Sequence, residues 1–303
     1  MIKHLRHSEI DKAQWDVLLL QCSDRLWYMQ SWVLDVSCPG WEALMDVEHG
    51  AIMPLLWRRK LGVDYLYQPY GMQQQGVFAK APNSELHRTF LQEVPSRFKY
   101  WDIHVNASMQ SAPIAGVTVV ENTDQTLVMD RSIDTMRAAY STSHRRNMRK
   151  AVEAFPEVFE DLGIPEFVSL FQRTTGSRFA SIPEGGLVLL RKLMEVGKQK
   201  GQCRITSVNA SGAAIAAVCF MEWEGRCILL KAAADEAGKE QRAMFRLVDQ
   251  CIAHHAGSGM ILDFAGSNTD SVARFNAGFG AVSSVYLHLH RNLLPVPLRW
   301  IKR

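Results

Sequence analysis

The order of the predicted secondary-structure elements occurs twice along the chain, and this repetition constrains the fold more than any single motif. In each half, helical segments precede three strand-like runs separated by turns, and a helix and one more strand follow. The three-strand meanders span 41–68, in which 51–59 is predicted to be one strand, and 202–234. The closing strands carry Asp102 and Asp263. We interpret this order as an internal duplication of one fold, with a chance similarity of element order as the alternative.

The length of the chain favours two domains, because 303 residues are about twice the ~150 of a typical domain. We predict an N-terminal domain over 1–133, a C-terminal domain with the chemistry over 134–290, and a tail over 291–303 that packs back on the first domain. The N-terminus lacks the apolar stretch of a signal peptide, and the longest apolar run, 213–221, is far shorter than the ~20 residues that cross a bilayer. We therefore expect a cytoplasmic protein with no membrane span.

Net charge and cysteine spacing give no positive indication of a nucleic-acid partner, a membrane partner or a zinc ribbon. The formal net charge of +3 is too small to indicate a nucleic-acid or membrane partner by itself. The six cysteines include no Cys-x-x-Cys pair, which argues against a zinc ribbon and a disulfide scaffold. His288 and His290 share one face of a predicted strand, as two metal ligands could, but two solvent-facing polar residues are the alternative when no third ligand is evident. We expect no metal site and no tightly bound cofactor.

A strand-to-helix connection in the second half has the composition of an anion site. The start of a helix offers unpaired N–H groups and a partial positive charge. In the segment 230–245, Gly238 would let the backbone approach a ligand closely, and Lys239 and Arg242 add full charges. This arrangement suits the pyrophosphate of an acyl carrier such as coenzyme A, and an ordinary capped helix with two solvated bases is the alternative. The predicted donor-binding residues are Lys231, Gly238, Lys239 and Arg242.

A basic helix enters the second half of the chain. Its four bases fall at i, i+4 spacing and form a stripe, which favours an anionic partner because like charges at this spacing disfavour an isolated helix. These bases are Arg145, Arg146, Arg149 and Lys150. The alternative is a solvated face in which they pair with Glu153, Glu157 and Glu160.

Near the C-terminus, a strand ends in Gly266-Ser-Asn268, a short helix carries Arg274, Phe275 and Asn276, and Phe279-Gly280 leads into the last strand. Together with the two segments above, this segment resembles the Fem-like branch of the GNAT superfamily of N-acyltransferases, which includes peptidoglycan-bridge peptidyltransferases. The matching patterns are the Arg-x-Asn-x-Arg-Lys-Ala-type helix at 145–151, the Asp-Phe-x-Gly strand end at 263–266, and the Phe-Lys…Phe-Gly pattern at 275–280. The first half resembles that branch only in element order.

The resemblance implies an α+β fold of two tandem GNAT-like domains, each a mixed, mainly antiparallel sheet flanked by helices. In such a fold, two neighbouring parallel strands splay apart and leave backbone groups free to hold the donor. The implied activity is N-acyl transfer to an amine from acyl-CoA, an acyl carrier or an aminoacyl-tRNA as co-substrate. The implied partners are a small-molecule acyl donor and an anionic acceptor or tRNA, and the oligomeric state stays open.

One departure from the family pattern bears on activity. Asn276 stands where the pattern has Lys, which weakens the aminoacyl-tRNA interpretation and favours the alternative of a non-catalytic binding or scaffold protein on a decayed acyltransferase fold. Asp263, Glu222 and Tyr286 are all conceivable general bases, and Asp263 and Tyr286 are the predicted catalytic residues. The predicted substrate-binding residues are Arg145, Arg146, Arg149, Lys150, Asn268, Arg274, Phe275 and Asn276.

Overall fold

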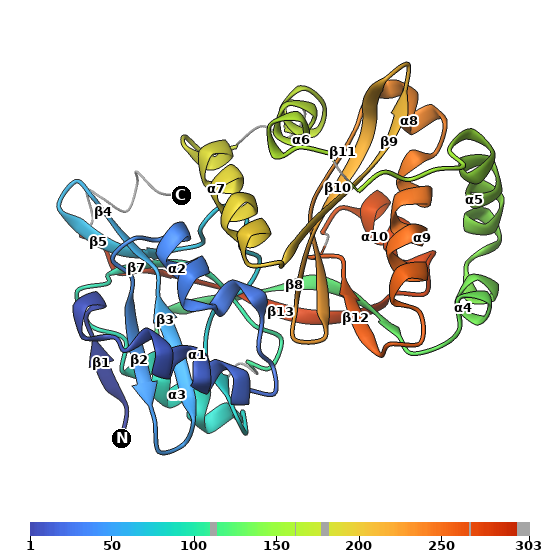
Figure 1. Cartoon of the computed structure of the whole chain (residues 1–303). Helices are drawn as coiled ribbons and strands as arrows, with labels where there is room; N and C mark the ends of the chain where they lie inside the picture. Colours follow the sequence, from blue (N-terminus) through green and yellow to red (C-terminus); the bar gives the residue numbers. More distant parts are fainter. Residues whose placement is uncertain (110–113, 161, 177–181, 267, 296–303) are drawn as a thin grey trace. The chain divides into compact units, whose positions relative to one another are not determined.

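The computed structural model describes residues 1–109, 114–160, 162–176, 182–266 and 268–295 (Figure 1). The chain forms two compact units. The first unit comprises Met1–Asn122 and the C-terminal segment from Val285, and the second unit comprises Thr123–Ser284. Two strands, β8 (Val117–Met129) and β13 (Val282–Asn292), contribute residues to both units.

These unit boundaries lie before the predicted domain boundaries at 133/134 and 290/291. The last strand, expected within the C-terminal domain, pairs from Leu287 onward with a strand of the first unit. The beginning of the predicted tail also lies in the first unit, where Leu294 is buried. The rest of that tail, 296–303, lies outside the described residues.

The first unit contains two sheets. Its further elements are β1 (Lys3–Leu5), α1 (Lys12–Gln21), α2 (Ser31–Ser37), β2 (Glu42–Asp46), β3 (Ala51–Leu55), β4 (Trp57–Lys60), β5 (Val63–Tyr67), β6 (Phe78–Ala79), α3 (Ser84–Gln92) and β7 (Tyr100–Val105), with 3-10 turns at His7–Glu9 and Trp27–Met29. One sheet has the order β1-β2-β3-β6, and the other runs β4-β5-β7 and continues into the C-terminal part of β13. Asp11 and Asn83 cap the starts of α1 and α3 with their side chains.

The predicted single strand over 51–59 is wrong, because the chain changes sheet at Leu56. β3 pairs with β2 and β6, whereas β4 forms a hairpin with β5 in the other sheet. Every residue of β3 is buried, but the charged residues of β4 are exposed. The Leu56 carbonyl accepts the Tyr67 N–H at 3.0 Å at the point of change. The segment 41–68 is therefore two hairpins in two sheets, and it does not match the second meander.

The second unit is built on one sheet of order β8-β12-β11-β10-β9. Its elements after β8 are α4 (Ile133–Ala139), α5 (Thr142–Ala154), α6 (Ile164–Phe171), a π-helical turn (Gln172–Gly176), α7 (Gly186–Gln199), β9 (Cys203–Ala210), β10 (Ala213–Trp223), β11 (Arg226–Ala234), α8 (Glu236–Glu240), α9 (Ala243–His255), β12 (Met260–Asp263) and α10 (Asp270–Ala277). Two-residue turns at Ser211-Gly212 and Glu224-Gly225, all with positive φ, join β9, β10 and β11. Positive φ at both positions is typical of the type I′ turns that favour tight hairpins, so the predicted second meander is confirmed.

Each unit contains the same four-strand arrangement. In the first unit the hairpin β4–β5 is followed by a helix, by β7 parallel to β5, and by β13 antiparallel to β7. In the second unit the hairpin β10–β11 is likewise followed by the helix α9 and by β12, which is parallel to β11. The strand β8 is antiparallel to β12. Asp102 and Asp263 therefore lie on matching strands, in register with Tyr67 and Ile228. The predicted fold class, a mixed and mainly antiparallel α+β fold, is confirmed.

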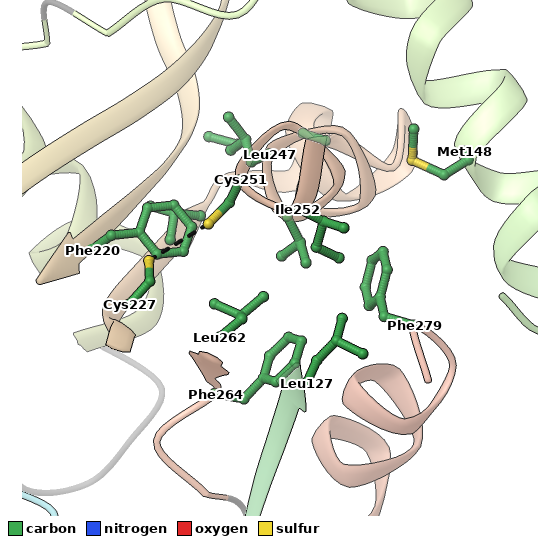
Figure 2. Packing of buried hydrophobic residues seen from close by; sticks show 14 of the residues in the cluster. Leu127, Met148, Phe220, Cys227, Leu247, Cys251, Ile252, Leu262, Phe264 and Phe279 are labelled. Atoms are coloured by element: carbon green, nitrogen blue, oxygen red, sulfur yellow. Dashed lines mark hydrogen bonds between the residues drawn. The ribbon is translucent and has the colours of Figure 1, made fainter. Parts of the chain in front are cut away.

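The core of the second unit lies between the sheet and α9 (Figure 2). Leu247 and Ile252 of α9 pack with Phe220, Leu262 and other buried side chains of the sheet. Burying apolar area of this kind contributes ~25 cal/mol per Å² and holds the helix on the strands. In the part of the chain that the structure describes, no helix has the length and apolar character needed to span a membrane.

Candidate functional site

The parallel strands β11 and β12 separate soon after they begin to pair. Only three residue pairs join them, and the last pair is Ile228 with Asp263. β12 ends there, whereas β11 continues to Ala234. Among the described strands, none continues beside 229–234 on this side of β11. The sheet therefore divides at Asp263 and leaves one edge of β11 without a neighbouring strand, as the resemblance implied.

A β-bulge lies where the two strands separate. In the pairing of β10 with β11, Phe220 opposes Leu229 and Cys219 opposes Lys231, so Leu230 is an extra residue in β11. A bulge bends its strand and increases the local twist, and such bulges are common next to active sites. The bulge turns the second part of β11 away from the line of β12.

A helix begins near the far end of β11. Because α9 follows β11 and returns along the sheet, its first turn lies at the end toward which β11 diverges (Figure 1). Arg242 precedes α9 with φ 66°, and no side chain caps the helix there. The preceding five-residue helix α8 is capped by Asp235, whose carboxylate accepts the Gly238 N–H at 2.9 Å. The first turn of α9 therefore offers a partial positive charge without a capping side chain.

The predicted donor-binding bases lie along this strand–helix connection. The Lys239 ammonium is 3.0 Å from a Glu236 carboxylate oxygen, and Arg242 donates to the Lys239 carbonyl at 3.5 Å. Lys231 lies on β11 opposite Cys219, where burial lowers the pKa of its ammonium. The structure thus brings Lys239 and Arg242 together beside the start of α9 and places Lys231 on the strand that leads to them.

Gly238 has a different setting from the one expected. Its φ is not positive, and a Cβ added to it would lie 2.8 Å from the Ile215 carbonyl oxygen of β10. Glycine is required here because α8 packs closely against that backbone. Its N–H is already engaged by Asp235, so a direct contact of Gly238 with a donor stays a prediction.

Asp263 ends β12 as a fully buried carboxylate. It accepts from the Arg226 guanidinium at 2.7 Å and from the Ala265 N–H at 2.8 Å. Burial and the neighbouring Asp124 raise the pKa of Asp263 to about 6, against the opposing effect of Arg226. Ala265 and Gly266 follow with φ of 55° and 65°, so the aspartate holds a turn of left-handed residues. These contacts describe a positioning residue, and a catalytic role stays a prediction.

The helix α10 is fastened to β8 by amide side chains. The Asn276 amide is buried and donates to the Gln125 side-chain oxygen at 2.9 Å, and Gln125 in turn donates to the Ala273 carbonyl at 3.0 Å. The Asn268 side-chain oxygen accepts the Thr123 N–H at 3.0 Å. Asn276, at the position of the family lysine, thus faces Gln125, whereas Arg274 is exposed.

Comparison with known proteins agrees with this fold. Residues 138–270 match the family described as Acetyltransferase (GNAT) domain. The chain has a GNAT-type fold. The crystal structure of FemX is similar over 99% of both chains, with a TM-score of 0.65 and 11% sequence identity. A conserved protein of unknown function from Bacteroides thetaiotaomicron VPI-5482 covers 96% of this chain and 100% of its own, with a TM-score of 0.63 and 9% identity. No curated protein matches the sequence.

An aromatic cluster explains the phenylalanines of the C-terminal pattern in this GNAT-type fold. The ring of His144, at the start of α5, contacts Phe245, Phe275 and Phe279 with centroid distances of 4.8–5.7 Å. A His144 ring nitrogen is 2.8 Å from the Phe275 carbonyl oxygen, and a Cβ on Gly278 would overlap the ring. Burial lowers the pKa of His144, which favours the neutral imidazole. His144 was not predicted from the sequence, although it lies directly before the matched basic helix pattern.

The basic stripe of α5 divides into one structural base and three free ones. The Arg145 guanidinium donates to the Ala138 carbonyl at 3.0 Å and also to the Tyr140 carbonyl, which closes the end of α4. The other three bases are exposed, and within the described residues no ion pair engages them: Arg146, Arg149 and Lys150. Glu160, one of the expected partners, instead lies 3.6 Å from Arg204. The three outer bases therefore remain available to an anion.

The other candidate bases differ in setting. Tyr286 belongs to the first unit, where it is buried and its ring contacts His104 at 5.8 Å. Glu222 lies in the second unit; burial would raise its pKa, but His255 and Arg204 outweigh that effect and lower the pKa to about 2. Glu222 is therefore ionised at neutral pH and is a weak base.

Proposed function

We propose that this chain is an N-acyltransferase that moves an acyl or aminoacyl group from an activated donor to an amine. The observation that carries the proposal is the separation of β11 from β12 at Asp263. A strand edge without a neighbouring strand can hold an extended chain by backbone hydrogen bonds, as in the addition of a peptide strand to a sheet. The amide groups of a pantetheine arm, or an aminoacyl chain, have the chemistry to bind along this part of β11 in this way.

The start of α9 would bind the anionic part of the donor. Its uncapped first turn combines backbone N–H groups with two basic side chains beside it, Arg242 and Lys239, of which Lys239 is paired with Glu236. A pyrophosphate or a phosphate backbone suits such a helix start. A donor held at both places would have its acyl carbonyl near the bulge in β11.

The reaction needs positioning more than strong acid–base groups. The acceptor amine attacks the acyl carbonyl, a C–N bond forms, and the C–S or C–O bond to the carrier breaks as the amine proton passes to solvent or to the leaving group. Holding both reactants in line and donating hydrogen bonds to the carbonyl oxygen supply most of the acceleration in such sites. The burial of Asp263 and the low pKa of Glu222 fit a mechanism in which the amine arrives deprotonated.

The acceptor would carry negative charge. Arg146, Arg149 and Lys150 are exposed on α5, whose ends contact Phe245 and Arg246 in the first turn of α9. This stripe favours an acceptor with phosphate or carboxylate groups, or a tRNA donor whose backbone lies along α5.

Thermal unfolding and transfer assays test the proposal. Coenzyme A at 100 times its dissociation constant stabilises a fold by ~2.7 kcal/mol and should raise the melting temperature by several degrees. Lys239→Glu should remove the shift, whereas Lys192→Glu, an exposed base on α7, should preserve it. The same pair is then assayed for transfer from acyl-CoA, from an acyl carrier and from aminoacyl-tRNA to an amine panel. The absence of both a shift and transfer with every donor would overturn the proposal.

The alternative is a binding protein on a decayed acyltransferase fold. Asn276 favours it, because this position carries a buried amide bonded to Gln125 in place of the family's cation. A donor-dependent shift without transfer to any amine would support this alternative.

A further inference from the structure

The second unit contains a cluster of soft and hard metal-binding groups away from the start of α9. Cys227 of β11 and Cys251 of α9 are fully buried, and their sulfur atoms are 3.6 Å apart (Figure 2). His255, one turn further along α9, brings a ring nitrogen within 4.8 Å of both sulfurs. Glu222 lies directly across the β10–β11 hairpin from Cys227. These four residues come from three elements that the core fixes in place.

Three of the distances within this cluster are close to those around a tetrahedral zinc ion. Two sulfurs each about 2.3 Å from tetrahedral zinc lie about 3.8 Å apart, and nitrogen and oxygen ligands at about 2.0–2.2 Å lie about 3.3–3.5 Å apart. The observed separations are 3.6 Å between the sulfurs, 3.2 Å between the His255 nitrogen and the Glu222 oxygen, and 3.8 Å between that oxygen and the Cys227 sulfur. We propose that Cys227, Cys251, His255 and Glu222 form a structural site for a soft divalent metal such as Zn²⁺.

Arg204 of β9 decides whether the charge of such a site is tolerable. Its guanidinium donates to the Glu222 carboxylate at 2.6 Å, lies 3.2 Å from the His255 nitrogen, and approaches Cys251 at 3.8 Å. When Zn²⁺ binds, two thiol protons leave as one dication enters, so the net charge of the cluster does not change. Arg204 then balances the surplus negative charge of two thiolates and a carboxylate around the ion, as a second-layer partner of the carboxylate.

The site would be structural because protein atoms occupy all four positions of the tetrahedron. It would join α9 to the hairpin β10–β11 and so fix the helix whose first turn is the proposed donor site. The ion can enter on the side of Glu222 and Arg204, whose side chains are 24% and 15% exposed. The proposal does not depend on the proposed transferase activity.

Cobalt substitution in the full-length, reduced protein tests the site. Co²⁺ should bind in a one-to-one ratio, with thiolate-to-metal charge-transfer absorption and the visible bands of tetrahedral coordination. Cys251→Ser and His255→Ala should lose this spectrum, and Glu222→Gln should weaken affinity by at least ~10-fold. Excess Zn²⁺ should displace Co²⁺ and raise the melting temperature of the wild type by several degrees, but not that of His255→Ala.

Two control variants separate this cluster from other groups. Cys203→Ser alters the other close pair of thiols, Cys203 and Cys219 at 3.7 Å, and should preserve the spectrum. His49→Ala alters the exposed group of Asp46, Glu48 and His49 and should preserve it as well. A spectrum without thiolate bands, its loss in either control, or its survival in Cys251→Ser would overturn the proposal. A wild type that binds no Co²⁺, and whose two thiols only form a disulfide on oxidation, would overturn it too. Should Cys251→Ser fail to fold, Glu222→Gln and His255→Ala decide the question.

Discussion

The two units contain the same parallel strand pair, but only one of the pairs opens. In the first unit β5 ends at Tyr67, where its pairing with β7 also ends, opposite Asp102. In the second unit β11 continues six residues, 229–234, beyond its last pair with β12. The strand edge that a donor would need is therefore built into the second unit and is absent from the corresponding position of the first.

Two glutamines close that position in the first unit. After a loop that follows β5, Gln75 forms a parallel bridge with Val105 of β7. The hydrogen bonds of this bridge run from the Gln75 N–H to the His104 carbonyl and from the Asn106 N–H to the Gln75 carbonyl, both at 2.8 Å. The Gln75 side chain donates to the Tyr67 carbonyl at 3.0 Å, and the Gln68 side chain accepts the His104 N–H at 3.0 Å. These bonds occupy the backbone groups that the end of β5 leaves free.

The aspartates on the matching strands, Asp102 and Asp263, also differ between the two units, in burial and in their partners. The Asp102 side chain is 49% exposed and lies 2.7 Å from a ring nitrogen of His288. Asp263 is fully buried, pairs with Arg226 and holds the turn after β12. The same strand arrangement therefore has two outcomes. In the first unit the gap at the end of β5 is filled, whereas in the second unit β11 and β12 separate and Asp263 fixes the end of β12.

The largest expected effect comes from removing the two aspartates. Asp263→Ala should lower the free energy of unfolding by about 3 kcal/mol, near the lower limit for breaking a buried ion pair because Arg226 is partly exposed. Asp102→Ala should cost less than about 1 kcal/mol, as expected for an exposed pair. Urea denaturation of both variants measures the difference, and equal losses would show that the two strand ends are equivalent.

The closure by glutamine gives the next largest effect. Gln75→Ala should lower the free energy of unfolding by about 2 kcal/mol, because the Tyr67 carbonyl loses its buried donor. The exposed Gln14→Ala on α1 is the matched control and should change stability by less than about 0.5 kcal/mol. Coenzyme A binding should not change in either variant, since the proposed donor site belongs to the second unit. A gain of binding in Gln75→Ala would indicate that the first unit also holds a donor once it is opened.

The sequence predicted what depends on local patterns. Gly212 and Gly225 marked the hairpins of the second meander, and the apolar runs between them formed its strands. The division of 51–59 at Leu56 could not be predicted, because apolar and charged residues follow each other without a turn signal and only the two separate sheets distinguish them. The closure by Gln75 could not be predicted either, because Gln75 pairs with Val105 of β7, which lies thirty residues further along the chain.

The candidate site was predictable in part. The resemblance implied a separation of parallel strands, which lies at Asp263. The composition of 230–245 predicted Lys239 and Arg242, which lie beside the start of α9. The pairing of the buried Asp263 with Arg226 and the close packing of Gly238 against the Ile215 carbonyl could not be predicted. The sequence motifs do not connect the members of either pair. The cysteine–histidine cluster that we propose as a metal site was not predicted, because its members come from separate elements at spacings with no zinc signature.

A change of pH should alter stability by an intermediate amount, and this change should depend on Asp263 but not on Asp102. The pKa of Asp263 is about 6 in the folded state, above its ordinary 3.8, so the folded chain binds more protons than the unfolded chain between these values. Stability should therefore fall as the pH rises through this range, by about 1 kcal/mol between pH 5 and pH 7. Asp263→Asn should lack this fall, and Asp102→Asn should retain it. Denaturation at the two pH values decides, and an unchanged fall in Asp263→Asn would assign it to another group.

The smallest effect on stability is expected for the basic stripe, where the comparison concerns binding instead. Arg146→Ala with Arg149→Ala should leave the melting temperature nearly unchanged, because both side chains are exposed and within the described residues neither has an ion pair. Arg145→Ala should lower it, since Arg145 donates to the carbonyls at the end of α4. The double variant should weaken binding of an anionic acceptor or tRNA by several-fold and flatten its salt dependence, whereas Arg145→Ala should change neither greatly. Titrations at two salt concentrations measure both quantities. If Arg145→Ala alone weakened binding, or the double variant alone lost stability, the assignment of one structural base and three free ones would be wrong.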